Sequence, residues 1–243
     1  MVITLMLTLV VSINTSGELK VEILDLPFSQ ELITLTPNLG SSDNQLFLSW
    51  IERNSDGHTL KVSHWNGDRF ETPNNVYSST QVFANWADFA SVLPLGSNRL
   101  VTHWLEKAAD GLYEYDIFVS LSDDGGKTWG VPFKPHRDST LSEHGFVSMV
   151  RDGDQGFHIA WLDGREFKNP LTDREMTLRF SRFQRGVFGE EVVLDTRVCE
   201  CCQTGMASTP SGLFVAYRDR SREEIRDISF VRSVNGEWST PKS

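Results

Sequence analysis

Three arginines in the C-terminal half of the sequence have the chemistry to bind an anion. They are Arg165, Arg218 and Arg220. A guanidinium group holds a carboxylate or a sulfate through two parallel hydrogen bonds. We therefore predict that these arginines bind an acidic glycan or another small anionic ligand. The alternative is that each arginine pairs with a neighbouring acid, such as Asp163 or Asp219, and makes its loop rigid.

Four carboxylates and one histidine are candidates for acid–base chemistry. Most glycosidases need two carboxyl groups about 5–10 Å apart, whereas sialidases replace the carboxylate nucleophile with tyrosine. Asp88, Asp163 and His144 are the candidate catalytic residues, and Glu143 and Asp219 are candidate substrate contacts. For each carboxylate the alternative is a solvated surface group. His144 is alternatively a metal ligand, a sugar contact or a structural histidine bonded to a loop carbonyl.

All three cysteines fall within the four residues Cys199-Glu-Cys-Cys202. Because three is an odd number, a single chain cannot pair them all in disulfides. Their thiolates could bind zinc or Cu(I), although the spacing matches no standard zinc ribbon. A disulfide to another segment is favoured over a metal site at Cys199, Cys201 and Cys202 and over free thiols. We expect no cofactor.

These residues belong to a sequence unit that repeats four times. Each unit contains an alternating segment that closes with an aromatic residue, and successive aromatics are 54, 57 and 56 residues apart. An acid follows each aromatic after two positions. The four pairs are Trp50 and Glu52, Trp104 and Glu106, Trp161 and Asp163, and Tyr217 and Asp219. A strand precedes each segment, and a second strand, a turn and a further aromatic follow it.

Four strands per unit predict the blade of a β-propeller in an all-β protein. The four blades are expected at about residues 30–76, 85–135, 143–194 and 202–243. The strand Glu18–Ile23 is suited to the outer edge of a closing blade. The four blades either close a small ring or form part of a larger one. We expect the larger ring, because an open array leaves strand edges unpaired.

Loops in a propeller alternate between two faces, which sorts the candidate residues. The connections between blades, and the loops between the second and third strands of each blade, crowd the central channel on one face. That face is expected to hold Asn85–Asp88, His136, Glu143–Gly145, Cys199–Cys202, Glu106, Trp161–Arg165 and Tyr217–Ser221. The turns between third and fourth strands lie at the periphery of the other face.

One of these outer turns has a recognisable sequence, with the pattern S-x-D-x-G-x-T-W. Its residues are Ser122, Asp124, Gly126, Thr128 and Trp129. Asp124 is placed to accept hydrogen bonds from turn N–H groups, and Gly126 tolerates a positive φ. We expect a structural hairpin turn and no chemistry. An ordinary glycine-rich hairpin is the alternative, and the spaced oxygen ligands of an EF-hand are absent.

The net charge of −10 over 243 residues argues against nucleic acid and anionic membranes as partners. Residues 1–16 contain an apolar run too short to span a bilayer, so this segment is either a signal peptide or an ordinary N-terminal strand. Residues 17–243 are expected to form one propeller domain, with no transmembrane segment. The oligomeric state is left open.

The turn pattern, the repeat and the arginine-bearing loops resemble the sialidase superfamily, in which this turn is called an Asp box. More narrowly, five segments resemble a bacterial sialidase-like group whose function is largely unassigned. They are Asn85–Asp88, Glu143–Ser148, Trp161–Arg165, Val198–Thr204 and Tyr217–Ser221. The resemblance implies a six-bladed propeller, export from the cell and a ligand site at the central channel. It also implies a further cysteine in a later segment.

The sequence departs from sialidases in one respect that bears on function. Sialidases carry a carboxylate-binding arginine in a motif near the first blade, but no arginine precedes Arg53 here. Two functions therefore remain open at the central face. One is glycoside hydrolysis on acidic sugars, of the exo-α-sialidase type, and the other is non-catalytic binding of a glycan or a protein. A third alternative is metal binding by the cysteines with His144.

Overall fold

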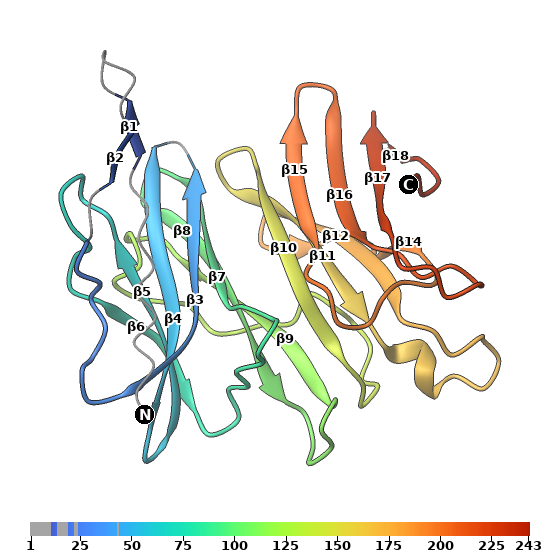
Figure 1. Ribbon diagram of the computed structural model, residues 1–243, viewed down its shortest axis with the longest axis horizontal. Coiled ribbons are helices and arrows are strands. Elements are labelled where there is room, and N and C mark those ends of the chain that lie inside the picture. The colour runs from blue at the N-terminus through green and yellow to red at the C-terminus, as the bar shows by residue number, and fades with distance from the viewer. Residues whose placement is uncertain (1–10, 14–18, 22–23, 43) are drawn as a thin grey trace.

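The computed structural model describes residues 11–13, 19–21, 24–42 and 44–243. These residues form antiparallel sheets that follow one another in chain order (Figure 1). The only helical element among them is one turn of 3-10 helix, η1 (Arg165–Lys168). No helix in the described part of the chain has the length and hydropathy needed to cross a membrane. The prediction of an all-β fold is confirmed.

Each repeat unit contains one sheet. The first sheet holds β3 (Ile33–Ser42), β4 (Gln45–Asn54), β5 (Gly57–His64) and β6 (Asn74–Ser79). The second holds β7 (Ser91–Gly96), β8 (Arg99–Lys107) and β9 (Tyr115–Ser122). The third holds β10 (His144–Asp152), β11 (Gly156–Asp163), β12 (Thr177–Gln184), β13 (Val187–Phe188) and β14 (Val192–Asp195). The fourth holds β15 (Gly205–Thr209), β16 (Gly212–Arg218), β17 (Ile228–Val234) and β18 (Glu237–Trp238).

The second strand of each sheet carries the repeated aromatic and its acid. Side chains two positions apart in a strand share a face, so the indole N–H of the tryptophan can reach the carboxylate. It does so in three sheets, from Trp50 to Glu52 (3.1 Å), from Trp104 to Glu106 (2.8 Å) and from Trp161 to Asp163 (2.8 Å). In the fourth sheet the Tyr217 hydroxyl instead donates to Asp195 of β14 (2.6 Å). The repeated acid therefore satisfies a buried N–H group in three sheets.

The first strands of neighbouring sheets lie side by side. Strand β3 contacts β7, β7 contacts β10, and β10 contacts β15. Polar side chains also join neighbouring sheets. Ser49 of β4 donates to the carbonyl of Ala90, just before β7 (3.0 Å), and Thr204, just before β15, donates to the Phe146 carbonyl of β10 (2.7 Å). A Cβ on Gly40 would stand 1.8 Å from the Val92 carbonyl oxygen, so glycine permits this approach of two backbones. Four sheets whose first strands adjoin are consistent with a propeller.

Two details differ from the sequence-based prediction. The second sheet has three strands, and its expected fourth strand is reduced to a single bridge between Val119 and Phe133. The strand expected at Glu18–Ile23 is present as β2 (Leu19–Val21), but it pairs with β1 (Val11–Ile13) in a separate two-stranded sheet. Among the described residues it pairs with no strand of the four sheets, and its role in a closing blade stays a prediction. Most of segment 1–16 lies outside the described residues.

The S-x-D-x-G-x-T-W turn has the local chemistry expected of it. The Asp124 carboxylate accepts hydrogen bonds from the N–H groups of Lys127 (3.0 Å) and Thr128 (2.9 Å) and from the Thr128 hydroxyl (2.6 Å). These bonds, the Thr128 hydroxyl first, hold the pKa of Asp124 at about 2. Gly126 has a φ of 87°, and its carbonyl accepts the Trp129 indole N–H (3.2 Å). The turn is thus closed by its own side chains.

Candidate functional site

One cavity of about 750 Å³ is formed where loops of several sheets meet. Connections between sheets contribute Asn85, Trp86, Glu143, Glu200 and Cys201. Loops between the second and third strands add Gly111–Glu114 from the second sheet and Phe167 and Lys168 from the third. Segments far apart in the sequence thus line one recess. We call this recess the central-face cavity.

Aromatic and apolar side chains form much of its wall. Trp86 and Tyr113 are exposed by 83% and 62% of their surface, and Leu112 is also exposed. Phe83 and Phe167 line the cavity as well. Exposed aromatic rings at the rim of a cavity are a common feature of ligand sites.

Glu143 is the carboxylate whose surroundings in this cavity are most unusual. It is 7% exposed, and its Oε1 accepts a hydrogen bond from the buried Tyr115 hydroxyl. Burial raises the pKa of Glu143, and the charge of Glu200 raises it further, although the bond from Tyr115 opposes them. A carboxyl group with a raised pKa can act as a general acid. Glu200 lies 2.7 Å from Arg220, so a second carboxylate of the same cavity is paired with a cation.

Asp88 lies beneath this wall and does not line the cavity. It is 3% exposed, and its Oδ2 accepts the Phe146 N–H (2.5 Å) while its Oδ1 has no hydrogen-bond partner. Burial raises the pKa of Asp88 to about 7. A Cβ on Gly145 would stand 2.2 Å from Asp88 Oδ2, so glycine at this position lets the carboxylate approach the strand.

His144, the first residue of β10, belongs to a buried network of histidines and aspartates. Its ring stacks on the His136 ring with centroids 4.1 Å apart and an interplanar angle of 4°. Asp116 Oδ1 lies 3.4 Å from a nitrogen of each ring, and Asp138 Oδ1 lies 3.1 Å and 3.2 Å from their other nitrogens. Burial alone would lower the pKa of His144, but the bond to Asp138 and the charge of Asp163 raise it.

The same network contains Asp163 and Arg165. Asp163 has no exposed surface, and it accepts hydrogen bonds from the Trp161 indole (2.8 Å) and from Arg165 Nε (2.8 Å) and Nη2 (2.6 Å). Arg165 also pairs with Asp138 (3.1 Å) and with Glu191 (2.8 Å). Arg165 is therefore surrounded by carboxylates that already neutralise it. Neither residue lines the central-face cavity.

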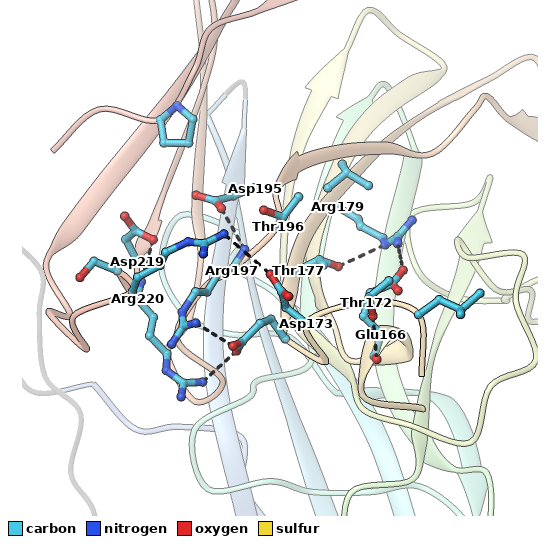
Figure 2. A pocket seen from close by; sticks show the side chains of 16 residues that line it. Glu166, Thr172, Asp173, Thr177, Arg179, Asp195, Thr196, Arg197, Asp219 and Arg220 are labelled. Atoms are coloured by element: carbon cyan, nitrogen blue, oxygen red, sulfur yellow. Dashed lines mark hydrogen bonds and ion pairs between the residues drawn. The ribbon is translucent and has the colours of Figure 1, made fainter. Parts of the chain in front are cut away.

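Arg220 and Asp219 line a second cavity, of about 690 Å³, between the third and fourth sheets (Figure 2). Each of its four guanidinium groups lies within 3.9 Å of a carboxylate. The pairs are Arg179 with Glu166 (3.1 Å), Arg197 with Glu175 (2.8 Å), Arg220 with Glu175 (3.2 Å) and Arg222 with Asp173 (3.9 Å). Figure 2 shows Arg179 on one side and Arg197 and Arg220 on the other.

The three arginines predicted to bind an anion do not share one site. Arg165 lies in the buried network and Arg220 in the second cavity. Arg218 donates to the Arg226 carbonyl (3.1 Å) and lies 3.6 Å from the Cys202 sulfur. Of the other predicted site residues, Glu143 and the candidate metal ligand Cys201 line the central-face cavity. The catalytic roles of Asp88, Asp163 and His144 stay predictions.

Sequence reasoning missed Tyr113 and Phe167 as lining residues, and it placed Glu200 on the central face within Cys199–Cys202 without giving it a role. Tyr113 lies between strands, and Phe167 belongs to η1, so neither falls in the repeated pattern. Glu200 sits among the cysteines that drew attention to that segment. The one sequence signal for these residues was that their loops were expected on the central face.

Solved structures show what this architecture is similar to, although no protein-family model and no curated protein sequence matches the chain. A protein of unknown function from Dyadobacter fermentans superposes with a TM-score of 0.63 at 13% identity, over 88% of this chain and 70% of that one. An α-L-arabinanase from Penicillium chrysogenum gives a TM-score of 0.53 at 17% identity, over 84% and 63%. A neuraminidase-like protein from A/bat/Guatemala/164/2009 gives 0.54 at 8% identity, over 86% and 54%.

These likenesses bear on the fold alone, because the sequence identities are low. They support a propeller fold of the kind found in glycoside hydrolases and neuraminidase-like proteins. The chain spans 70% of the Dyadobacter protein and about half of the neuraminidase-like protein. The number of blades in a complete ring stays a prediction.

Proposed function

We propose that this chain is a glycosidase-like propeller that binds a neutral glycan in the central-face cavity. The observation that supports it most is the joint placement of exposed Trp86 and Tyr113 with the buried carboxyl group of Glu143 around one recess. A sugar ring presents apolar C–H faces to aromatic rings and hydroxyl groups to carboxylates. The cavity offers both kinds of partner.

The charge of the cavity favours a neutral sugar over an acidic one. Three glutamates, Glu114, Glu143 and Glu200, line it with a single cation, Lys168. That cation, Lys168, already pairs with Glu114 (3.8 Å), so the lining offers no unpaired cation to an anionic ligand. The prediction of an acidic glycan relied on Arg165, Arg218 and Arg220, and none of these three side chains lines this cavity.

Glu143 and Glu200 are the carboxylates we propose for hydrolysis. Glu143 would protonate the leaving oxygen of the glycosidic bond, since its pKa is raised. Glu200, paired with Arg220, would act as the second carboxylate that such hydrolysis requires. Two carboxyl groups whose surroundings differ in this way are the usual arrangement for an acid and its partner.

A second candidate function is glycan binding without catalysis. It is favoured by the contacts that already engage both carboxylates, because Tyr115 donates to Glu143 and Arg220 pairs with Glu200. In that case the same aromatic rings hold the sugar and the glutamates accept its hydroxyl hydrogen bonds.

Binding and hydrolysis are separated by testing two variants against a panel of neutral and acidic oligosaccharides. Trp86→Ala is expected to weaken binding by at least about tenfold, because an aromatic contact of this size contributes more than about 1.4 kcal/mol. Val131→Ala removes an equally exposed apolar side chain outside the cavity and is expected to change nothing. Glu143→Gln is expected to lower turnover by about 10²–10⁴-fold while binding persists.

Each outcome discriminates between the proposals. Binding of neutral glycans with no release of reducing sugar would support the non-catalytic alternative. Preference for acidic glycans, or equal binding by Trp86→Ala and the parent chain, would refute the proposed site.

A further inference from the structure

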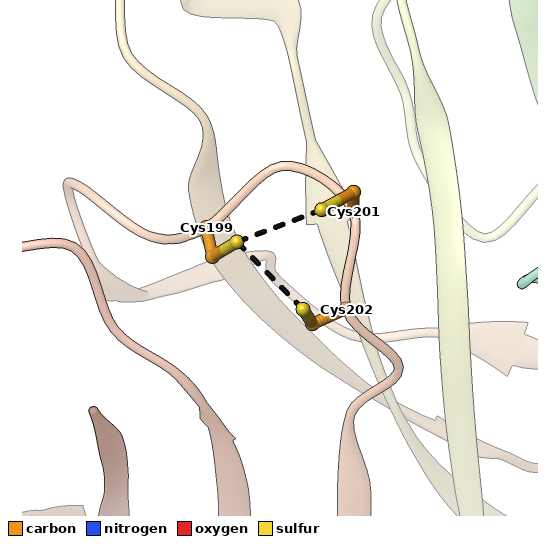
Figure 3. A group of neighbouring side chains, drawn as sticks. All are labelled: Cys199, Cys201 and Cys202. Atoms are coloured by element: carbon orange, nitrogen blue, oxygen red, sulfur yellow. Dashed lines mark hydrogen bonds between the residues drawn. The ribbon is translucent and has the colours of Figure 1, made fainter. Parts of the chain in front are cut away.

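The three cysteine sulfurs converge on one point in the connection between β14 and β15. Cys199 Sγ lies 3.8 Å from Cys201 Sγ and 3.7 Å from Cys202 Sγ, and all three atoms lie within 4.8 Å of one another. Figure 3 shows Cys201 and Cys202 directed from the returning chain toward Cys199. Three convergent sulfurs from four consecutive residues are a preformed ligand set.

Two of the three sulfur separations, 3.7 Å and 3.8 Å, are close to those around a bound metal ion. With metal–sulfur bonds of about 2.3 Å, sulfurs stand about 3.8 Å apart in a tetrahedral site and about 4.0 Å apart in a trigonal one. In the described part of the chain, no histidine, aspartate or glutamate joins the group as a fourth ligand. A site with three sulfurs and no fourth ligand favours trigonal coordination of a soft ion.

Two arginines adjoin the sulfurs and would compensate thiolate charge. Arg226 Nη1 lies 3.5 Å from Cys199 Sγ, and Arg218 Nη1 lies 3.6 Å from Cys202 Sγ. Three thiolates around a monovalent ion carry two net negative charges, and the two guanidinium groups beside the sulfurs oppose them, although Arg226 also lies 3.6 Å from Glu224. Around a divalent ion only one negative charge would remain.

We propose that Cys199, Cys201 and Cys202 bind one Cu(I) ion in a three-sulfur site capped by Arg218 and Arg226. The three thiols release their protons to solvent as the ion binds, and no electron is transferred. Cys201 is exposed and lines the central-face cavity, so the ion has a route from solvent to the buried Cys199 sulfur. The site therefore borders the cavity without including its aromatic wall.

The test uses the full chain, reduced and handled without oxygen, and titrated with Cu(I) against a chromophoric Cu(I) chelator. One ion per chain is expected, with X-ray absorption showing three sulfur neighbours. Cys201→Ser and Cys202→Ser should abolish retention against the chelator, and both keep the buried Cys199 in place. Arg226→Gln should weaken binding by about 10–100-fold, the usual effect of removing a group that supports metal ligands. Ser208→Ala, an exposed change on β15, should have no effect.

Three results would overturn the proposal. The first is loss of Cu(I) to the chelator from the reduced parent chain. The second is undiminished binding by Cys201→Ser, which would show that the exposed thiol is not a ligand. The third is a four-coordinate zinc ion that Cu(I) does not displace, which would reassign the sulfurs to a divalent metal.

Discussion

Asp88 provides the most quantitative prediction of this structure, because its carboxyl group is buried and one of its oxygens has no partner. Burial raises its pKa from 3.8 to about 7. A folded-state pKa above the unfolded value means that the native state holds the proton more tightly. The resulting stability is fully present below the unfolded pKa of 3.8 and is lost as pH rises through the folded pKa of about 7. Over that window the loss amounts to about 4 kcal/mol.

Asp88→Asn should remove this pH dependence, because an amide keeps the acceptor for the Phe146 N–H and does not ionise. The free energy of urea unfolding is measured for both proteins at about pH 5 and about pH 8. Between these two pH values the stability of the variant should rise by about 3 kcal/mol relative to that of the parent. Asp110→Asn, at an exposed position, should track the parent at both pH values. A difference between Asp88→Asn and the parent that stays constant with pH would refute the reasoning, since it would mean that Asp88 ionises normally in the folded protein.

Two further predictions concern buried positions and are measured by urea unfolding. Asp163→Asn should lower the free energy of unfolding by about 1–3 kcal/mol, because it removes the buried carboxylate that pairs with Arg165, while Asp138 and Glu191 still neutralise that cation. The matched change Asp154→Asn, at an exposed ion pair, should cost less than about 1 kcal/mol, and equal losses would contradict burial as the cause. Gly40→Ala should cost about 1–3 kcal/mol, because its Cβ would overlap the Val92 carbonyl. Gly205→Ala meets no atom within 4 Å and should cost less; the reverse order would contradict the packing of β3 on β7.

Much of the fold was predictable because each repeat satisfies the same physical requirements. The aromatics Trp50, Trp104, Trp161 and Tyr217 are all buried on the second strands of their sheets. The regular spacing of these aromatics along the sequence predicted where the four sheets lie. The absence of a fourth strand from the second sheet could not be predicted. The sequence shows a turn and a following aromatic there, but it does not show that the returning chain pairs with β9 only through a single bridge at Val119.

The position of the repeated acid could be predicted from the sequence, but its structural role could not. Its position was visible, but its role as acceptor for an indole N–H depends on both side chains sharing a strand face. The sequence analysis placed Glu106 and Asp163 in loops of the central face, with Asp163 as a candidate catalytic residue. In the structure Asp163 is the last residue of β11 and Glu106 the last but one of β8, and each accepts the hydrogen bond of the tryptophan two residues before it.

The partners of the arginines could not be predicted, because they come from distant segments. Arg220 pairs with Glu175 and Glu200, which are 45 and 20 residues away. Loop geometry decides which of many acids reaches a given guanidinium, and the sequence does not give that geometry. The same holds for Glu143, whose hydrogen-bond donor Tyr115 lies 28 residues before it.

The most direct test of the account is a crystal structure of the full chain soaked with a neutral oligosaccharide that binds in solution. The account predicts density for a sugar ring against the Trp86 indole, with a hydroxyl or glycosidic oxygen at hydrogen-bonding distance from Glu143. Sugar bound elsewhere, with the central-face cavity empty in the same crystals, would contradict it.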